Sequence, residues 1–408
     1  MAARIFHGWV VVAAVHLLLF TVFGATYSFS SFFTPIATEF NASRASVSFT
    51  FALAVFLYFS VGAIAGPIAD RVPLRAVTCT GIVALAGGLW MASEARSLFA
   101  LYTWFGIAIG LGVGACYVPA ISAVQPWFIK RRGMAAGLAS AGIGLGTLVV
   151  PYFAAHLVES HGWRASLKGL AGGALLVGFF AAWLVEKSPT ARGLHPDNDP
   201  TSNAPNLAST GMGLRQALHT REFRLMFTAL LVVALVQFMP FVHLARHAAD
   251  RGFSAAQGAL LVGLIGVGSF VGRFAFAGFA DRLGFARMLA LCFGVMSLAF
   301  ALWLGSLAWS PSMAALAGFA LLMGLGYGGY VGIMPALAMQ YFGGKNLAGI
   351  IGALYFAAGL GTLVSPTFAG WAFDRNGSYG LPIALGVVVT LLASGLVLRL
   401  PRERGPLG

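Results

Sequence analysis

Arg273 is the residue whose type and position in this sequence point most directly to chemistry. It lies in the apolar run from Leu260 to Ala280, and it is the only charged side chain that we place near the middle of a membrane. Asp281 ends the run eight residues later, so Arg273 lies about 12 Å deep in a hydrocarbon core roughly 30 Å thick. A lone cation at that depth is expected to face the protein interior or a water-filled path and to mark a substrate or ion site. Its natural partner is an anion.

The acidic residues offer Arg273 no partner inside the predicted spans, because every one of them maps to a loop or to the end of a span. They are Glu39, Asp70, Glu94, Glu159, Glu186, Asp197, Asp199, Glu222, Asp250, Asp281, Asp374 and Glu403. A guanidinium can bind a carboxylate through two parallel hydrogen bonds. We therefore expect Arg273 to bind the carboxylate of a substrate. The competing interpretation is an arginine that is held by backbone carbonyls and binds no ligand.

Aromatic hydroxyls are the next candidates for this site. Tyr117 precedes Pro119 and Tyr330 precedes Pro335, in glycine-rich stretches at corresponding places of the two halves of the chain. Helices interrupted at paired positions are typical of transport sites, so we expect both hydroxyls to donate to a bound carboxylate. The other predicted lining residues are Tyr27, Ser269 and Tyr355.

Histidine is the side chain that titrates in the physiological range, and two histidines fall within predicted spans. His16 lies in the first span and His243 near the outer end of the seventh. If protons are co-transported, the candidates are His16, His243 or the bound substrate itself. A histidine that is simply hydrogen-bonded within a helix is the competing interpretation for each.

The composition requires elements that cross a membrane repeatedly. Hydrophobic residues make up 59% of the 408 residues, charged residues make up 9%, and the mean hydropathy is +0.86. A span needs about 20 apolar residues, and charges or turn residues cut the chain into twelve such stretches. We place them near 9–30, 47–69, 76–92, 98–123, 134–158, 167–185, 223–244, 260–280, 288–307, 313–338, 347–371 and 379–398.

The basic residues orient these spans. On the side of the two termini we count 17 lysines and arginines, and on the opposite side 7. Positive loops face the cytoplasm, so both termini are predicted to be cytoplasmic in a cell inner membrane. The net charge of +13 is spread over short loops and not gathered on one face, so we expect a lipid bilayer and no nucleic acid as the partner.

The chain divides into two matching halves. Residues 1–186 and 221–408 each hold six predicted spans, and the polar, proline-rich stretch 187–220 is a predicted cytoplasmic linker. Gly144-Leu-Gly-Thr-Leu-Val-Val-Pro151 recurs as Gly359-Leu-Gly-Thr-Leu-Val-Ser-Pro366. In the same repeat, Gly62 of the first half corresponds to Arg273 of the second half, 211 residues later. The sequence thus predicts an all-α polytopic membrane protein of two pseudo-symmetric six-helix bundles, a monomer that rocks about a central site.

Two loop motifs of this sequence resemble the major facilitator superfamily. Gly66-Pro-Ile-Ala-Asp70-Arg71-Val-Pro-Leu-Arg75 is similar to that family's motif between its second and third spans. Gly278-Phe-Ala-Asp281-Arg282-Leu-Gly284-Phe-Ala-Arg287 is the copy in the second half. Pro73 stands where the motif usually has glycine. The resemblance implies that the charged pairs of both motifs hold one face of the transporter closed: Asp70, Arg71, Asp281 and Arg282.

Within that superfamily the chain resembles the monocarboxylate transporters. The segment Trp127-Phe-Ile-Lys-Arg-Arg-Gly-Met-Ala-Ala-Gly-Leu-Ala-Ser-Ala-Gly142 is similar to their signature before the fifth span, and Gly8-Trp9 and Gly272-Arg273 fit the same family. The resemblance implies a small organic acid anion such as lactate or pyruvate, usually moved with a proton. Oxalate and formate exchangers are close relatives and remain an alternative.

The sequence departs from these relatives in ways that bear on the substrate. Tyr27 stands where mammalian members have a lysine, and Ser269 where they have an aspartate. Oxalate exchangers add a lysine in the eleventh span, whereas Leu347 to Trp371 contains none. With one cation at the site, a dicarboxylate would keep an unpaired charge in a low dielectric. A monocarboxylate fits better.

Other functional classes find little support. The chain has no HExxH motif, no Ser/His pair at a recognisable spacing and no Walker A motif, so we expect no enzyme, no cofactor and no metal. A dinucleotide fingerprint at Gly324 to Gly329 lies in an apolar span with no strand before it, and we discount it. The two-half repeat disfavours a channel.

Overall fold

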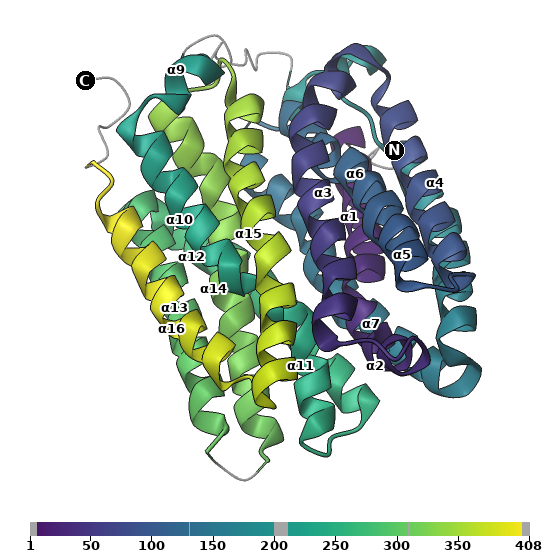
Figure 1. Cartoon of the computed structure of the whole chain (residues 1–408). Helices are drawn as coiled ribbons and strands as arrows, with labels where there is room; N and C mark the ends of the chain where they lie inside the picture. Colours follow the sequence, from purple (N-terminus) through teal and green to yellow (C-terminus); the bar gives the residue numbers. More distant parts are fainter. Residues whose placement is uncertain (1–5, 130, 200–210, 309–310, 402–408) are drawn as a thin grey trace.

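The computed structural model describes residues 6–129, 131–199, 211–308 and 311–401. Within these ranges the chain is helical, and the sole β-type contact is an isolated bridge between Gly211 and Gly343. Figure 1 shows the helices of the first half, in purple and blue, beside those of the second half, in green and yellow. The prediction of an all-α membrane protein built from two helix bundles is confirmed.

The first half is an array of helices that begins with a helix pair in the first span. Its elements are α1 (His7–Tyr27), α2 (Phe29–Glu39), α3 (Arg44–Arg71), α4 (Leu74–Ser93), α5 (Leu98–Leu101), the π-helix η1 (Tyr102–Ile109), α6 (Gly110–Val124), η2 (Gln125–Trp127), α7 (Arg132–Gly173), the π-helix η3 (Ala174–Gly178) and α8 (Phe179–Leu184).

The second half repeats this arrangement after short connecting helices. The connecting helices are η4 (Pro189–Arg192), η5 (Pro196–Asn198) and α9 (Leu214–Leu218). The second half consists of α10 (Arg221–Gln237), α11 (Met239–Asp250), α12 (Ala255–Leu283), α13 (Phe285–Ser306), α14 (Met313–Phe342), α15 (Leu347–Asn376) and α16 (Gly380–Leu398). The predicted boundaries 1–186, 187–220 and 221–408 stay a prediction, and part of the linker, 200–210, lies outside the described residues.

The described residues contain eleven helical segments that are long and apolar enough to cross a membrane. One of them, Met134–Leu184, has 51 residues, far more than a single crossing needs. Gly162 interrupts it with a φ of 78°, a left-handed conformation that glycine adopts without steric strain. This segment therefore holds the fifth and the sixth predicted spans, and the count is consistent with twelve.

Helix interruptions occur at paired places, but not where we expected them. We predicted breaks near Pro119 and Pro335, yet α6 and α14 continue through these prolines. That prediction was wrong, because a proline inside a packed membrane helix is tolerated when neighbouring groups compensate for the lost hydrogen bond. The interruptions lie in the first and seventh spans instead, at Ser28 between α1 and α2 and at Phe238 between α10 and α11.

The two halves meet along helix pairs that approach closely. Helix α3 packs against α15, and α7 packs against α12. A methyl group added to Gly144 on α7 would lie 2.7 Å from the Gly266 carbonyl oxygen of α12. A methyl group added to Gly370 on α15 would lie 2.6 Å from the Ala45 nitrogen of α3. Small residues thus let the backbones of the two halves touch, as in other membrane helix pairs.

A charged cluster lies on the face of the molecule that we call the linker side, where α1 begins and α8 ends. Glu186 accepts hydrogen bonds from the Arg192 Nε and Nη2 atoms at 2.6 and 2.7 Å and also pairs with Arg75. His7 Nε2 lies 3.4 Å from the same carboxylate. Hydrogen bonds from Arg192, more than the other neighbours, hold the pKa of Glu186 below its ordinary value.

A second cluster joins the two halves on the opposite face, the far side. Arg44 at the start of α3 donates to both carboxylate oxygens of Asp250 on α11, at 2.6 and 3.0 Å, and to the Tyr379 hydroxyl at 2.7 Å. Asp374 on α15 accepts from the backbone nitrogens of Arg44 and Ala45, at 3.1 and 3.0 Å, and so caps α3 across the interface. The far side is closed by these contacts.

We predict that Glu186 makes stability depend on pH. Since its pKa is lowered in the folded state, its contribution is present well above the ordinary value of 4.5 and is lost as the pH falls below it. Glu186→Gln should lower the apparent melting temperature at pH 7, and the gap to the wild type should narrow toward pH 4, as measured by thermal unfolding in detergent. Glu94→Gln, in an exposed pair with Lys168, is the control and should show a smaller gap. A gap independent of pH would contradict the assignment.

The far-side cluster should contribute measurably to stability. Asp250→Asn leaves the Arg44 guanidinium half-paired, and we expect a loss of about 1 to 2 kcal/mol, less than for a fully buried pair because both side chains are partly exposed. The double variant Arg44→Met with Asp250→Leu should lose less than the single changes predict together. The coupling is measured by thermal unfolding in detergent of the wild type, Arg44→Met, Asp250→Leu and the double variant. Stability losses that simply add would contradict a coupling between the two side chains.

Candidate binding site

A small cavity lies between the two halves, and helices of both contribute to its wall. Its volume is about 10 Å³, room for about one water molecule. The first half supplies Phe23, Tyr58, Phe59, Tyr117 and Ile143, and the second half supplies Arg273, Tyr327, Tyr330, Val331 and Tyr355. Apart from Arg273 the polar groups of this wall are tyrosine hydroxyls. The cavity is therefore small, lined mainly by aromatic and aliphatic side chains, and positive at one point.

Arg273 on α12 is buried, with 4% of its surface exposed, and it faces the interface between the halves. Its Nη1 atom donates to the backbone carbonyl of Ser140 on α7, in the opposite half. Its Nε and Nη2 atoms are buried and find no hydrogen-bond partner among the described residues. No described carboxylate forms an ion pair with it. The guanidinium thus keeps two free donors in a low dielectric.

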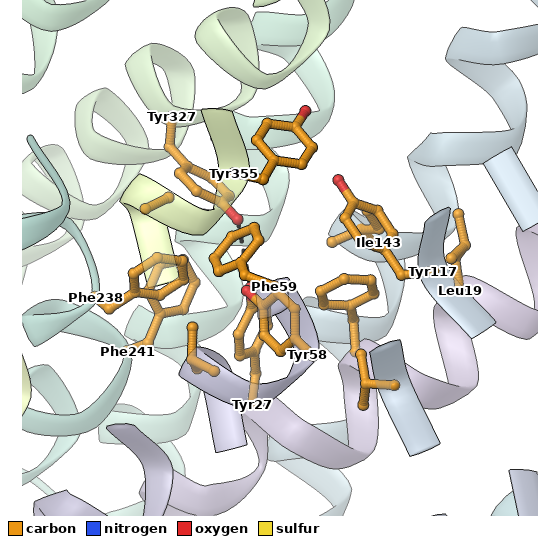
Figure 2. Packing of buried hydrophobic residues seen from close by; sticks show 14 of the residues in the cluster. Leu19, Tyr27, Tyr58, Phe59, Tyr117, Ile143, Phe238, Phe241, Tyr327 and Tyr355 are labelled. Atoms are coloured by element: carbon orange, nitrogen blue, oxygen red, sulfur yellow. Dashed lines mark hydrogen bonds between the residues drawn. The ribbon is translucent and has the colours of Figure 1, made fainter. Parts of the chain in front are cut away.

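Tyrosines surround this cation from several helices. The hydroxyls of Tyr27 on α1 and Tyr327 on α14 lie 3.4 Å apart, so the two halves also meet here. Figure 2 shows this pair, and it shows the hydroxyl oxygens of Tyr117 and Tyr355 directed toward a common region. These hydroxyls can donate to an anion or accept from a hydroxyl group.

The structure brings four of the predicted site residues into the cavity wall: Arg273, Tyr117, Tyr330 and Tyr355. Tyr27 and Ser269 lie outside the wall. Tyr27 reaches the cavity through Tyr327, and Ser269 lies one helical turn before Arg273, buried, with an Oγ atom that has no partner among the described residues. The proposed binding roles of all six remain predictions.

Neither predicted histidine lines the cavity. The His16 Nδ1 atom lies 2.8 Å from the Leu138 carbonyl oxygen, between α1 and α7. His243 belongs to the far-side cluster, where its ring nitrogens lie 3.0 Å from Ser48 Oγ, 2.9 Å from the Tyr379 hydroxyl and 2.8 Å from the Pro366 carbonyl oxygen. Both have local hydrogen-bond partners, and their proton-coupling roles stay predictions.

The charged loop motifs can be placed only in part. The side chains of Asp70, Arg71 and Asp281 lie outside the described residues, although their backbones belong to α3 and α12. Arg282 is exposed at the end of α12. The gating role that the resemblance implies for these residues stays a prediction.

Sequence reasoning missed two tyrosines of the cavity wall, Tyr58 and Tyr327. Both were within reach of signals already in the sequence. Tyr327 lies three residues before Tyr330 and therefore on the same face of one helix. Tyr58 is the residue of the first half that corresponds to Ser269, because the two are 211 residues apart, as Gly62 and Arg273 are. The repeat and the helical period together would have found them.

Because Arg273 is only partly satisfied, its removal should stabilise the protein. We expect Arg273→Met to raise the apparent melting temperature in detergent without added anions, since it replaces a buried, half-paired charge with an apolar side chain of similar length. Arg44→Met, which removes a well-paired guanidinium, is the matched control and should lower it. A similar loss in both variants would show that Arg273 is satisfied in the protein.

Comparison with known proteins places this arrangement in a family. The family model of the Major Facilitator Superfamily matches residues 15–306. Monocarboxylate transporter 12-B of Danio rerio is 27% identical over 96% of this chain and 86% of its own length. Monocarboxylate transporter 11 of Mus musculus is 27% identical over 97% of this chain and 88% of its own length.

A solved structure shares the fold over nearly the whole chain. It is a bacterial homolog of the human lysosomal transporter Spinster, inward-facing and occupied, with a TM-score of 0.69 at 16% identity, covering 99% of this chain and 98% of that one. At this identity the likeness concerns the fold alone. The chain belongs to the major facilitator superfamily and is a multi-pass membrane transporter, not an enzyme, similar to the monocarboxylate transporters.

Proposed function

We propose that the protein is a secondary active transporter of small monocarboxylate anions of the lactate or pyruvate type, coupled to protons and working by alternating access. The observation that carries this proposal is the guanidinium of Arg273, with two free donors at a cavity between the halves. The relatives named as monocarboxylate transporters support the same substrate class.

The free donors of Arg273 suit one carboxylate. Nε and Nη2 lie on the same edge of the guanidinium, so a single carboxylate can accept from both in parallel. Tyrosine hydroxyls of the wall, such as Tyr117 and Tyr355, can donate to the same anion. One negative charge neutralises the site, whereas a second would stay unpaired in a low dielectric. This favours a monocarboxylate over a dicarboxylate.

The contact between Arg273 and Ser140 suggests how binding is linked to movement. It crosses from α12 to α7, which belong to different halves. A carboxylate that draws the guanidinium toward itself weakens this contact and removes the net charge at the interface. The halves are then free to rock about the loaded site, as the transport cycle of this superfamily requires.

The small volume of the cavity fits one stage of such a cycle. A space of about 10 Å³ cannot admit lactate, so the wall must open for binding. The far-side cluster around Arg44 and Asp250 must separate for access from that face. We assign the linker side to the cytoplasm of an inner membrane, with both termini there and the protein a monomer, on the distribution of basic residues.

Anion exchange of the oxalate or formate type is the second candidate. The cavity wall contains no carboxylate and no histidine among its described residues, so it offers no side chain that titrates near neutral pH as a proton relay. In symport the proton would have to travel on the substrate or use His16 or His243. In exchange no proton site is needed.

Uptake of labelled lactate into proteoliposomes tests the role of Arg273. We expect Arg273→Ala to lower the rate at least about 100-fold, because charged hydrogen bonds to the anion are lost, and Arg273→Lys to restore part of it. Lys168→Ala, which removes an exposed cation paired with Glu94, should leave uptake unchanged. Unchanged uptake by Arg273→Ala would refute the proposal. Acceleration by an inward proton gradient indicates symport, and a requirement for internal anion indicates exchange.

A further inference from the structure

Gln237 is a buried amide for which the transport mechanism described so far has no use. It is the last residue of α10, where the seventh span is interrupted, and none of its surface is exposed. Both its Oε1 and its Nε2 atom are buried without a hydrogen-bond partner among the described residues. Both atoms lack a partner, so a half-turn flip of the amide, which exchanges the oxygen and the nitrogen, does not alter this finding.

An amide in this condition is unfavourable for the fold. A buried donor or acceptor without a hydrogen-bond partner lowers the stability of the folded state by about 1 to 3 kcal/mol, and the Gln237 amide contains one group of each kind. Gln237 also lies near the middle of the Arg221–Asp250 span, where water is scarce. Polar groups kept at that depth generally serve function. By contrast, the Gln257 side chain is satisfied in the capping box that begins α12.

The fold gives Gln237 a counterpart in the other half. Tyr27 ends α1 as Gln237 ends α10, and each stands directly before the interruption of its span. Both are fully buried. Tyr27 meets the Tyr327 hydroxyl, and the Gln237 amide has a polar interaction with the Tyr330 hydroxyl that falls short of hydrogen-bond geometry, so the amide is at best weakly satisfied. Paired helix interruptions at mid-membrane are typical of binding sites in two-fold repeated transporters.

Gln237 adjoins residues of the cavity wall without itself lining the cavity. The ring of the next residue, Phe238, packs against the rings of Tyr327 and Phe59, with ring centroids 6.2 and 6.0 Å apart. Both Tyr327 and Phe59 line the cavity. Tyr330, with which Gln237 interacts, is itself a wall residue. A rearrangement of this wall that admits a substrate would therefore bring the amide within reach of that substrate.

We propose that Gln237 determines substrate specificity by binding the second polar group of the substrate, while Arg273 binds the carboxylate. This inference rests on the proposed function and deepens it. The amide Nε2 donates to a carbonyl or hydroxyl oxygen, and Oε1 accepts from a hydroxyl group. A 2-hydroxy acid satisfies both atoms. An unsubstituted acid of the same size leaves the amide unpaired and is selected against.

Lactate and propionate are matched probes, since they differ by one hydroxyl group on the same carbon skeleton. In proteoliposomes we expect Gln237→Leu to lower kcat/KM for lactate uptake about tenfold and to leave kcat/KM for propionate uptake nearly unchanged. The ratio of the two values should therefore fall about tenfold. The variant should be at least as stable as the wild type in detergent, because it removes an unsatisfied amide. If it fails to fold, Gln237→Met serves the same test.

Gln257→Leu is the control, because it removes a satisfied amide at a helix cap far from the cavity wall. It should lower stability slightly and leave the uptake ratio unchanged. Equal changes in both rates for Gln237→Leu, or no change in either, would overturn the role of Gln237 and leave the carrier function intact. A wild-type protein that transports neither acid would overturn the proposed function, and this inference with it.

Discussion

The partial satisfaction of one guanidinium in a low dielectric is the constraint on which the proposed transport function depends. Arg273 gives one donor to the Ser140 carbonyl of the opposite half and keeps Nε and Nη2 without partners among the described residues. A fully paired arginine would lock the halves together, and a fully unpaired one would be too costly to bury. The half-paired state joins the halves and leaves two donor atoms without a partner. In the proposed cycle, binding and movement therefore involve the same side chain.

The remaining contacts between the halves fit this division of roles. Glycine-lined helix pairs bring the backbones of α7 and α12 and of α3 and α15 into close contact. The strong polar bonds lie at the far side, where Arg44, Asp250 and Asp374 join α3 to α11 and α15. Charged pairs that are partly exposed can separate into water, which a dry interface would not permit. A closed far side is therefore compatible with a cycle that opens it.

The sequence predicted the parts of this account that local patterns determine. Arg273 was identifiable because one charge in an apolar run is a strong signal, and the spans and the repeat follow from composition. Tyr58 and Tyr327 were missed although the repeat and the helical period pointed to them, because these signals were not applied to Ser269 and Tyr330. The interruptions were misplaced because Pro119 and Pro335 are accommodated by their neighbours. The pairing of Arg44 with Asp250 joins the ends of two helices that are far apart in the sequence, which no local pattern encodes.

The most direct test of the central claim is an experimental structure of the protein with lactate bound. The account predicts that the carboxylate accepts hydrogen bonds from Nε and Nη2 of Arg273 and that the contact between Nη1 and the Ser140 carbonyl is lengthened or broken. A carboxylate bound elsewhere, with the Arg273 guanidinium still on Ser140, would contradict it.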